Sequence, residues 1–386
     1  MTEVDDLSRS LVAFAQDSTL VAVVEMSQSS WLVGGLVPGV MRQPLKKLEP
    51  QVEGLLRLIE RWRSEAAAVG RRIERTVLAY EAGRDGFWLA RWLWAQGIET
   101  YVIHPTSIPV PREHKRAKTD RLDTAMLLRA FLGWLRGERK HCSMAAIPTL
   151  EEEDAKRPSR EREALVNERT RIINRMKSTF ARLGIRGFKP ELRKAAARLE
   201  GLRLPEGAPV PPNTMAELRR DLERLGVIRK QIEAIEQERE RRLEEAPCHG
   251  APATVRLLSR VYGLGLETAD MLTHEIFYRR LRDQRAVARY AGMTGSPDES
   301  GRKRREKGLA KAGNARVRKG MIQLAWRFLL FQPQSPLVQW YRERIAQGMR
   351  KTSAVVAFAR KLLIALWRMV ETGEVPQGLV LRPATR

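Results

Sequence analysis

The first third of the chain alternates between strand-like and helix-like spacing of its apolar residues. Strands are expected where apolar and β-branched residues run together, in "TLVAVVEM", "SWLVGGLV", "ERTVLAYEAG" and "IETYVIHP". A short polar turn joins the first two, as in a hairpin, and Pro105 ends the last. Helices are expected in "LEPQVEGLLRLIERWRSEAAA", in "DGFWLARWLWAQG", which Gly97 closes, and in the run after Lys118. Strands that alternate with helices predict an α/β layer fold.

The middle of the chain, from about Glu151 to Glu245, is more highly charged and has no strand signal. Two apolar seams with helical spacing occur there, on either side of the Pro-rich break "LPEGAPVPPN". The first contains Leu165, Ile172, Met176, Phe180 and Leu183, and the second contains Leu218, Leu222, Leu225, Ile228, Ile232 and Ile235. Such seams favour a coiled coil or a helical hairpin, which could carry an oligomer contact. Solvated helices that pack only within the chain are an equally good interpretation.

A third, helical region begins at about Ala251 and is interrupted by a Gly-rich, basic loop between Met293 and Arg318. The fold class is therefore α/β plus all-α, in three domains. Residues 1–140 form the α/β domain, residues 141–250 a helical or coiled-coil connector, and residues 251–386 a helical carboxy-terminal domain.

Composition restricts the class of partner. Of 386 residues, 43% are hydrophobic, as expected for a folded globular protein, and the net charge of +24 favours a polyanionic partner such as nucleic acid. The most apolar segment near the carboxy terminus is interrupted by Arg360, Lys361 and Arg368, so no membrane span and no membrane partner are expected.

The termini and cysteines indicate the compartment. The amino terminus, "MTEVDDLSRS", is acidic and polar, unlike a secretion signal. Cys142 and Cys248 lie far apart in sequence and outside any zinc-binding pattern. A reducing cytoplasm is the expected location.

Four acidic residues are placed where they could converge. Glu25 and Glu81 end predicted strands, and side chains at the carboxyl ends of parallel strands line sites in α/β sheets. Asp120 and Asp123 begin a predicted helix with a spacing that puts both on one face. Converging carboxylates favour Mg²⁺ or Mn²⁺, and two such ions can stabilise the attacking and leaving oxygens of a phosphodiester. Acids in a first helical turn can also serve only as caps.

The basic loop offers a second kind of chemistry. Ser300 precedes Gly301 and stands among residues suited to bind phosphate, namely Arg302, Lys303, Arg304, Arg305, Lys311, Asn314 and Arg318. A serine hydroxyl in such a loop could attack a phosphodiester and form a covalent protein–DNA intermediate. The alternative is a loop that only grips phosphate, with Ser300 as one hydrogen-bond donor.

A Gly-x-Gly turn precedes this loop, in "LLSRVYGLGLETADMLTHE". Such a turn between two helices is similar to a helix-hairpin-helix, in which Gly263 and Gly265 would let backbone N–H groups face a phosphate. A plain tight turn between packed helices fits the same pattern.

The segments "YEAGRDGF", "VIHPTSIP" and "KTDRLDTAMLL", in this order, resemble the amino-terminal half of the IS110 family of DEDD transposases, which includes the Piv-type DNA invertases. The resemblance implies a RuvC-like fold of the ribonuclease-H type with an Asp, Glu, Asp, Asp tetrad. Glu81 matches the Glu, and Asp120 and Asp123 match the last two acids. The first position departs from the pattern, because Glu25 stands where the family has Asp.

The segment "SGRKRREKGLAKAGNARVRKGMIQLAW" resembles the carboxy-terminal transposase motif of that family, in which the serine before glycine is the nucleophile. Ser300 matches this serine. The resemblance implies a transposase or site-specific recombinase of an insertion sequence that acts on double-stranded DNA at the element ends and the target. It also implies a structured guide RNA, a composite site in a homo-oligomer (dimer or tetramer), and a bacterial, nucleoid-associated location.

Two other functions remain open at this stage. One is a metal-dependent RuvC-like junction nuclease, in which the acids activate water and Ser300 only binds. The other is a non-catalytic DNA- or RNA-binding relic, in which Glu25 would be a sign of decay.

Overall fold

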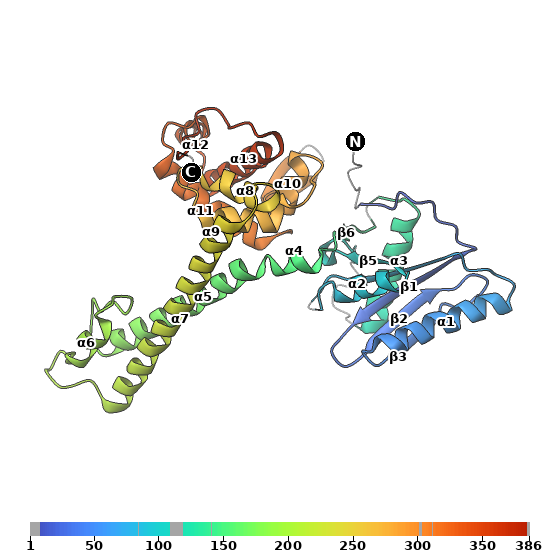
Figure 1. Cartoon of the computed structure of the whole chain (residues 1–386), viewed down its shortest axis with the longest axis horizontal. Helices are drawn as coiled ribbons and strands as arrows, with labels where there is room; N and C mark the ends of the chain where they lie inside the picture. Colours follow the sequence, from blue (N-terminus) through green and yellow to red (C-terminus); the bar gives the residue numbers. More distant parts are fainter. Residues whose placement is uncertain are drawn as a thin grey trace. The chain divides into compact units, whose positions relative to one another are not determined.

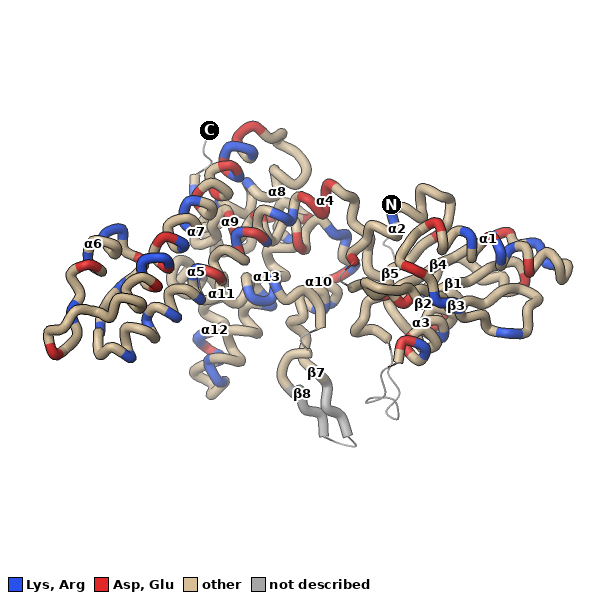
Figure 2. The backbone as a smooth tube through the Cα atoms, turned by 90° about the horizontal axis from the view of Figure 1, so that it is seen from below, with Lys and Arg blue, Asp and Glu red and all other residues tan. Residues whose placement is uncertain are grey.

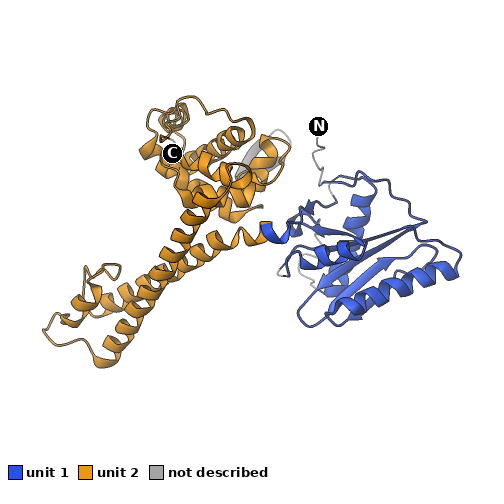
Figure 3. Ribbon diagram, in the orientation of Figure 1, with its two compact units in different colours: residues 1–151 blue, residues 152–386 orange. Residues whose placement is uncertain are grey.

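The computed structural model describes residues 8–83, 85–108, 119–139, 141–300, 303–310 and 312–383, with the backbone alone described at 297–300 and 303–307. The chain divides into two compact units, residues 1–151 and residues 152–386 (Figure 3). Each unit is considered by itself.

The first unit is built on a six-stranded mixed sheet with the strand order β3-β2-β1-β4-β5-β6 (Figure 1). Its strands are β1 (Thr19–Met26), β2 (Trp31–Leu36), β3 (Leu45–Leu48), β4 (Arg75–Glu81), β5 (Glu99–Ile103) and β6 (Met144–Ala145). Strands β1, β4 and β5 are parallel, whereas β2, β3 and β6 are antiparallel to their neighbours. The short turn η1 (Pro105–Ser107) follows β5, as the proline in the sequence predicts.

Helices cover both faces of this sheet. On one face, α1 (Val52–Ala68) and α2 (Trp88–Ala95) share a core with Leu20, Ala22 and Val24 of β1. On the other face, α3 (Asp120–Leu135) packs on Val21 and Val23 of the same strand. Because a strand buried on both faces is apolar at every position, the continuous run in β1 is the local signature of this three-layer arrangement.

Two glycines of β2 allow the helices to pack this closely. A Cβ on Gly35 would lie 2.6 Å from the Trp62 ring of α1, and a Cβ on Gly34 would lie 2.8 Å from Thr124 of α3. Both distances are shorter than real Cβ contacts, so larger residues would push one helix off the sheet.

The second unit begins with a helical arm (Figure 1). Its helices are α4 (Leu150–Asp154, which starts in the first unit), α5 (Arg157–Arg182), α6 (Ala195–Glu200) and α7 (Pro212–Glu245). The ion pairs Arg162–Glu236 and Arg175–Asp221 show that α5 and α7 run antiparallel. The two apolar seams seen in the sequence face each other in this pair, so the helical hairpin is confirmed, while the coiled coil stays a prediction.

The rest of the second unit is a helical bundle with one β-hairpin. Its elements are α8 (Gly250–Ser259), α9 (Leu266–Leu272), the π-helical turn η3 (Thr273–Phe277), α10 (Gln284–Tyr290), β7 (Gly295–Ser300), β8 (Lys303–Leu309), α11 (Ala315–Phe331), α12 (Pro336–Ala346) and α13 (Lys351–Thr372). The core forms around α13, where Phe358, Leu362 and Leu366 are fully buried against α11 and its neighbours. Within the described residues, none of the helices is long and apolar enough to cross a membrane.

The structure corrects the sequence prediction in one region and extends it in another. The basic segment predicted as a loop contains the antiparallel strands β7 and β8. The short strands β3 and β6 were not predicted, because each is too short to show an alternating pattern. The mixed α/β and helical fold class agrees with the structure, whereas the RuvC-like assignment and the three-domain division stay predictions.

Candidate active-site residues

An acidic cleft lies at the carboxyl ends of β1 and β4. The strands are parallel neighbours with Val24 opposite Tyr80, so Glu25 and Glu81, one residue further on, reach the same edge of the sheet. The cleft has a volume of about 250 Å³ and is lined by Glu25, Met26, Ser27, Gln28, Glu81, Gly83 and Asp85. Two of the four acids predicted to converge, Glu25 and Glu81, therefore line one cleft.

The two glutamates also share one face of the sheet. Val24 and Tyr80 pack on the side of α1 and α2. Side chains alternate along a strand, so Glu25 and Glu81 are directed to the opposite side, which α3 covers. This is the helix that carries the two predicted aspartates.

Asp120 and Asp123 occupy the first turn of α3, as predicted. Thr119 caps this turn, since its Oγ1 accepts a hydrogen bond from a backbone N–H at 3.3 Å. The hydroxyl of Thr124 donates to the carbonyl of Asp120 at 2.7 Å, and Thr124 packs against Gly34 of β2. The cap and the Thr124 hydroxyl thus stabilise the first turn of α3 without using the two carboxylates, and Thr124 places this turn against β2.

The described residues do not assemble all four acids into one cluster. Asp120 and Asp123 are not part of the cleft lining, and no three Asp, Glu, His or Cys side chains in the described ranges lie close enough together to hold a metal ion. The donors fit Mg²⁺ or Mn²⁺ in kind, because the cleft offers hard carboxylate oxygens. The four-acid metal site stays a prediction.

Asp85 is a cleft residue that the sequence prediction missed. It lies four residues after Glu81, in the segment that joins β4 to α2. A second acid after the carboxyl end of a parallel strand is the available signal, but Asp85 precedes a glycine and therefore resembles an ordinary turn residue.

Ser300 is the last residue of β7 and is paired with Lys303, the first residue of β8. Its backbone therefore lies at the tip of the hairpin, while its side chain is outside the described residues. The same holds for the side chains of Lys303, Arg304 and Arg305, and Arg302 and Lys311 lie entirely outside the described residues.

Asn314 and Arg318 lie at the start of α11, which follows the hairpin. Oδ1 of Asn314 accepts hydrogen bonds from the backbone N–H groups of Arg316 at 3.0 Å and Val317 at 3.2 Å, so this residue is the N-cap of α11. Its Nδ2 donates to the carboxylate of Glu275 at 2.9 Å. Arg318 is half-buried in the next turn. Their contact with nucleic acid stays a prediction.

The Gly-x-Gly turn connects α8 to α9, as the sequence predicts. Gly263 has a φ of +94°, and a Cβ there would lie 2.8 Å from Phe331 of α11. Gly265 is the N-cap residue of α9. Gly263 is thus required by the left-handed backbone and by close packing, and a role in phosphate binding stays a prediction.

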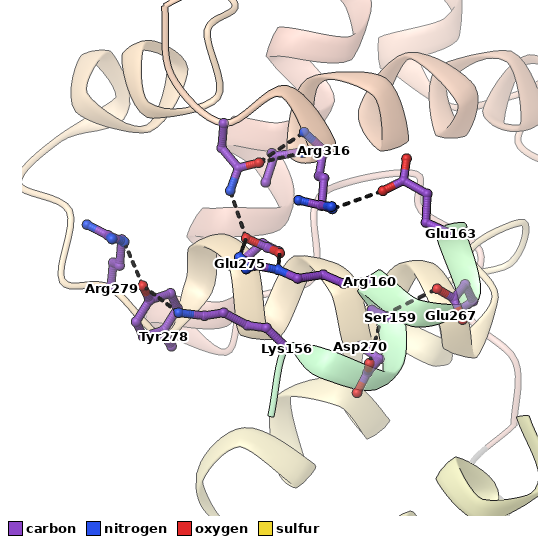
Figure 4. Close-up of polar contacts among 12 residues, drawn as sticks. Lys156, Ser159, Arg160, Glu163, Glu267, Asp270, Glu275, Tyr278, Arg279 and Arg316 are labelled. Carbon is purple, nitrogen blue, oxygen red and sulfur yellow. Dashed lines mark hydrogen bonds and ion pairs between the residues drawn. The ribbon is translucent and has the colours of Figure 1, made fainter. Parts of the chain in front are cut away.

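A buried ionic network in the second unit was also missed (Figure 4). Arg160 of α5 binds Glu275 of η3, and Ser159 of α5 donates to Asp270 of α9 at 3.1 Å. Burial raises the pKa of Tyr278, which accepts a hydrogen bond from Lys156 at 3.1 Å. Acids and bases on predicted helices are typical of solvated faces, so the sequence offers no signal for this cluster.

Comparisons with known proteins show similarity to transposases. A family model described as the transposase IS116/IS110/IS902 family matches residues 255–338, which include the Gly-x-Gly turn and the β7–β8 hairpin. A protein of Sinorhizobium fredii described as putative transposase y4rJ is 40% identical over 371 residues, which is 93% of this chain and 93% of that protein.

Proposed function

Because the chain belongs to the IS116/IS110/IS902 family of transposases, we propose that it cuts and rejoins double-stranded DNA at the ends of an insertion sequence and at its target. One observation carries this proposal, namely that residues 255–338, which match the family model, contain Ser300 at the tip of a basic hairpin. The acidic cleft with Glu25 and Glu81 supports it.

The amino-terminal unit would supply the metal site. In the proposal, Glu25 and Glu81 from the strand ends, with Asp120 and Asp123 from the same side of the sheet, would hold Mg²⁺ or Mn²⁺. When bound, the metal would offset the negative charge that develops on a phosphodiester under attack. Glu25 reaches one methylene further than the aspartate of the family pattern and would still offer an oxygen ligand.

Ser300 would act as the nucleophile. Its Oγ would form a bond to phosphorus while the bond from phosphorus to the leaving nucleotide oxygen breaks. The proton that the serine hydroxyl loses to solvent would be balanced by the proton that the leaving oxygen gains. Attack of a second strand's hydroxyl on the phosphoserine ester would then rejoin the DNA and restore the serine.

The basic residues near Ser300 would hold the nucleic acid in register. The proposal assigns phosphate contacts to Arg302, Lys303, Arg304, Arg305, Lys311, Asn314 and Arg318, and to the backbone at Gly263 and Gly265. Following the family resemblance, a structured guide RNA would select the DNA, and the serine of one subunit would act with the acids of another in a homo-oligomer.

A metal-dependent nuclease is a second candidate. It is favoured by the cleft itself, whose lining includes Glu25, Glu81 and Asp85 and none of the described residues of the hairpin that carries Ser300. In that case water would be the nucleophile, and strand breaks would carry no attached protein.

The first prediction concerns a covalent adduct. The full chain would be incubated with a nicked recombination-site substrate, the candidate guide RNA and Mg²⁺, and the products separated on a denaturing gel. A protein–DNA adduct is expected with the natural chain, and none with Ser300→Ala, which lacks the nucleophile, or with Asp120→Ala, which lacks a metal ligand. The Ser296→Ala variant is the matched control, because it removes another hydroxyl of β7 and should keep the adduct.

Other outcomes assign a different function. Cleavage without an adduct that persists in Ser300→Ala would support the nuclease. Tight binding of DNA without any cleavage in Mg²⁺ or Mn²⁺ would contradict both activities and identify a binding protein. If Glu25→Asp then restored cleavage, the lack of activity would be due to the glutamate that stands where the family has aspartate.

A further inference from the structure

Glu275 is the centre of the buried network in the second unit (Figure 4). It lies in the π-helical turn η3, where only 3% of its surface is exposed. Arg160 donates to both carboxylate oxygens, from Nε at 2.8 Å and from Nη2 at 3.2 Å, and Asn314 adds a third donor. Burial alone would raise the pKa of Glu275, but these donors hold it below its ordinary value, so the carboxylate is charged at neutral pH.

Asn314 links this carboxylate to the start of α11. Its Oδ1 caps the helix while its Nδ2 donates to Glu275, so both ends of the amide are used and its orientation is determined. Its backbone N–H donates to the carbonyl of Tyr290 at 2.6 Å. Asn314 is therefore held from three directions.

Asn314 stands at the base of the β7–β8 hairpin. The segments on either side of the hairpin pass each other closely there, since a Cβ on Gly313 would lie 2.7 Å from the carbonyl oxygen of Arg289. The N–H of Ala310 donates to the carbonyl of Thr294 at 3.0 Å and closes the hairpin. Because β7 and β8 are paired, contacts that hold the base of the hairpin also restrict the position of Ser300 at its tip.

The network attaches this base to α5, the first long helix of the second unit. Arg160 supplies the link to Glu275. One turn further along α5, Glu163 accepts from Arg316 at 2.9 Å and from Lys319 at 2.8 Å, both on α11. Helix α5 is thus linked to the base of the hairpin through Glu275 and Asn314, and separately to the body of α11 through Glu163.

We propose that Glu275 is a positioning residue for strand cleavage. With Arg160 and Asn314 it holds the base of the β7–β8 hairpin on α5, so that the serine at the tip is presented in one orientation. The proposal rests on the proposed function of Ser300, and it assigns Glu275 no contact with DNA.

The test compares Glu275→Gln with Glu163→Gln in the full chain. The glutamine at position 275 weakens the links to Arg160 and Asn314. The change at position 163 instead breaks the ion pairs between α5 and α11 without reaching Asn314. Glu275→Gln should lower the maximal rate of adduct formation at saturating DNA on the order of tenfold to a hundredfold, because a small misplacement of a reacting group is costly. The DNA concentration at half-saturation should stay within about twofold.

Exchanging the hydrogen-bond donor Asn314 and the acceptor Glu275 distinguishes a positioning role from a general loss of stability. Asn314→Asp keeps a good capping residue but sets two carboxylates against each other, so it should lower the maximal rate. Combining Asn314→Asp with Glu275→Gln places an amide donor at position 275 opposite a carboxylate acceptor at position 314, and should recover at least part of the maximal rate. The maximal rate of Glu163→Gln should stay close to that of the natural chain.

A readout without catalysis distinguishes the two proposals. Trypsin cleavage after the Lys and Arg residues between positions 302 and 307, measured by mass spectrometry on the free protein, should be faster in Glu275→Gln than in Glu163→Gln. If no variant forms an adduct but this difference is present, the proposed function fails and the positioning of the hairpin stands. Equal proteolysis in the two variants, or an undiminished maximal rate in Glu275→Gln, would overturn the positioning role.

Discussion

At the scale of single residues, buried charge is the feature that most constrains this protein. Glu275 and Asp221 are almost fully enclosed, and each is bound by arginine, Glu275 by Arg160 and Asp221 by Arg175 and Arg224. A carboxylate transferred from water to a protein interior is costly unless its oxygens are bound, and removing its partner leaves that cost uncompensated. These pairs therefore specify the packing of the helices that carry them.

The pH dependence of stability should reveal Glu275. Its pKa in the folded chain is lowered from the ordinary value of 4.5, so the stability gained from the charged form is present above that value and lost as the pH falls through the folded pKa. At pH 7, Glu275→Gln should be less stable by about 1–3 kcal/mol, and the gap should shrink steadily below pH 4.5. Urea unfolding of both proteins across this range measures the gap, and a gap of constant size would contradict the assignment.

At the scale of elements, helices here depend on packing more than on local propensity. The arm helix α7 has 34 residues and buries few of them, chiefly Leu218, Leu225, Ile228 and Ile232 against α5. Most of the stability of helices in proteins comes from packing of an apolar face, so the seam between α5 and α7 is expected to hold the arm together. In the sheet, packing requires a residue with low strand propensity, because only a glycine at position 35 leaves room for the Trp62 ring.

Two glycine substitutions should therefore have opposite effects. Gly226 lies inside α7, where an added methyl group would meet no other atom within 4 Å, so Gly226→Ala should stabilise the arm by about 0.5–1 kcal/mol. Gly35→Ala should destabilise the sheet by about 1–3 kcal/mol, because its methyl group would overlap Trp62.

Backbone hydrogen exchange in the full chain would locate both effects, with slower exchange in α7 for Gly226→Ala and faster exchange in β1 and β2 for Gly35→Ala. Adding Trp62→Phe to Gly35→Ala provides the control, since the smaller ring should recover part of the stability. Faster exchange in α7 of Gly226→Ala would contradict the expectation that this position is open.

At the scale of the whole molecule, the excess of positive charge is the dominant property. The chain carries 70 Lys and Arg against 46 Asp and Glu. In the arm the two signs are interspersed, and many of the arginines are already paired with acids (Figure 2). Paired arginines contribute less to phosphate binding, so the basic run near Ser300 should account for a disproportionate share of the affinity for nucleic acid.

The salt dependence of DNA binding should measure how much of the affinity comes from the basic residues near Ser300. Affinity for DNA should fall linearly on a log–log plot against salt concentration, because bound cations are released from the phosphates. Replacing Lys303, Arg304 and Arg305 with alanine should reduce the slope by about 1 for each phosphate that is no longer neutralised, whereas Ser300→Ala should leave it unchanged. Fluorescence anisotropy at several salt concentrations gives the slopes, and an unchanged slope in the triple variant would place the phosphate-binding residues elsewhere.

Local patterns were sufficient to predict most elements of this protein. The apolar run of β1 and the leucine spacing of α1 and α7 are properties of neighbouring residues, and the structure bears them out. The order of motifs from "YEAG" to the serine segment was sufficient to indicate the family, which the match of residues 255–338 to the family model and the similarity to the Sinorhizobium transposase together confirm. The strand ends also indicated where Glu25 and Glu81 lie, because parallel strands share an edge, whereas the convergence of all four acids stays a prediction.

Contacts between distant residues were decided only by the tertiary structure. Asp85 belongs to the cleft because β1 and β4 are neighbours, and the charged strands β7 and β8 exist because they pair with each other, although neither has an apolar pattern. Glu275 resembles a solvated helix residue until Arg160 and Asn314, both distant in sequence, are brought to it. The sequence thus determines the elements, since periodicity is local, whereas the partners of each charge depend on long-range packing that periodicity does not encode.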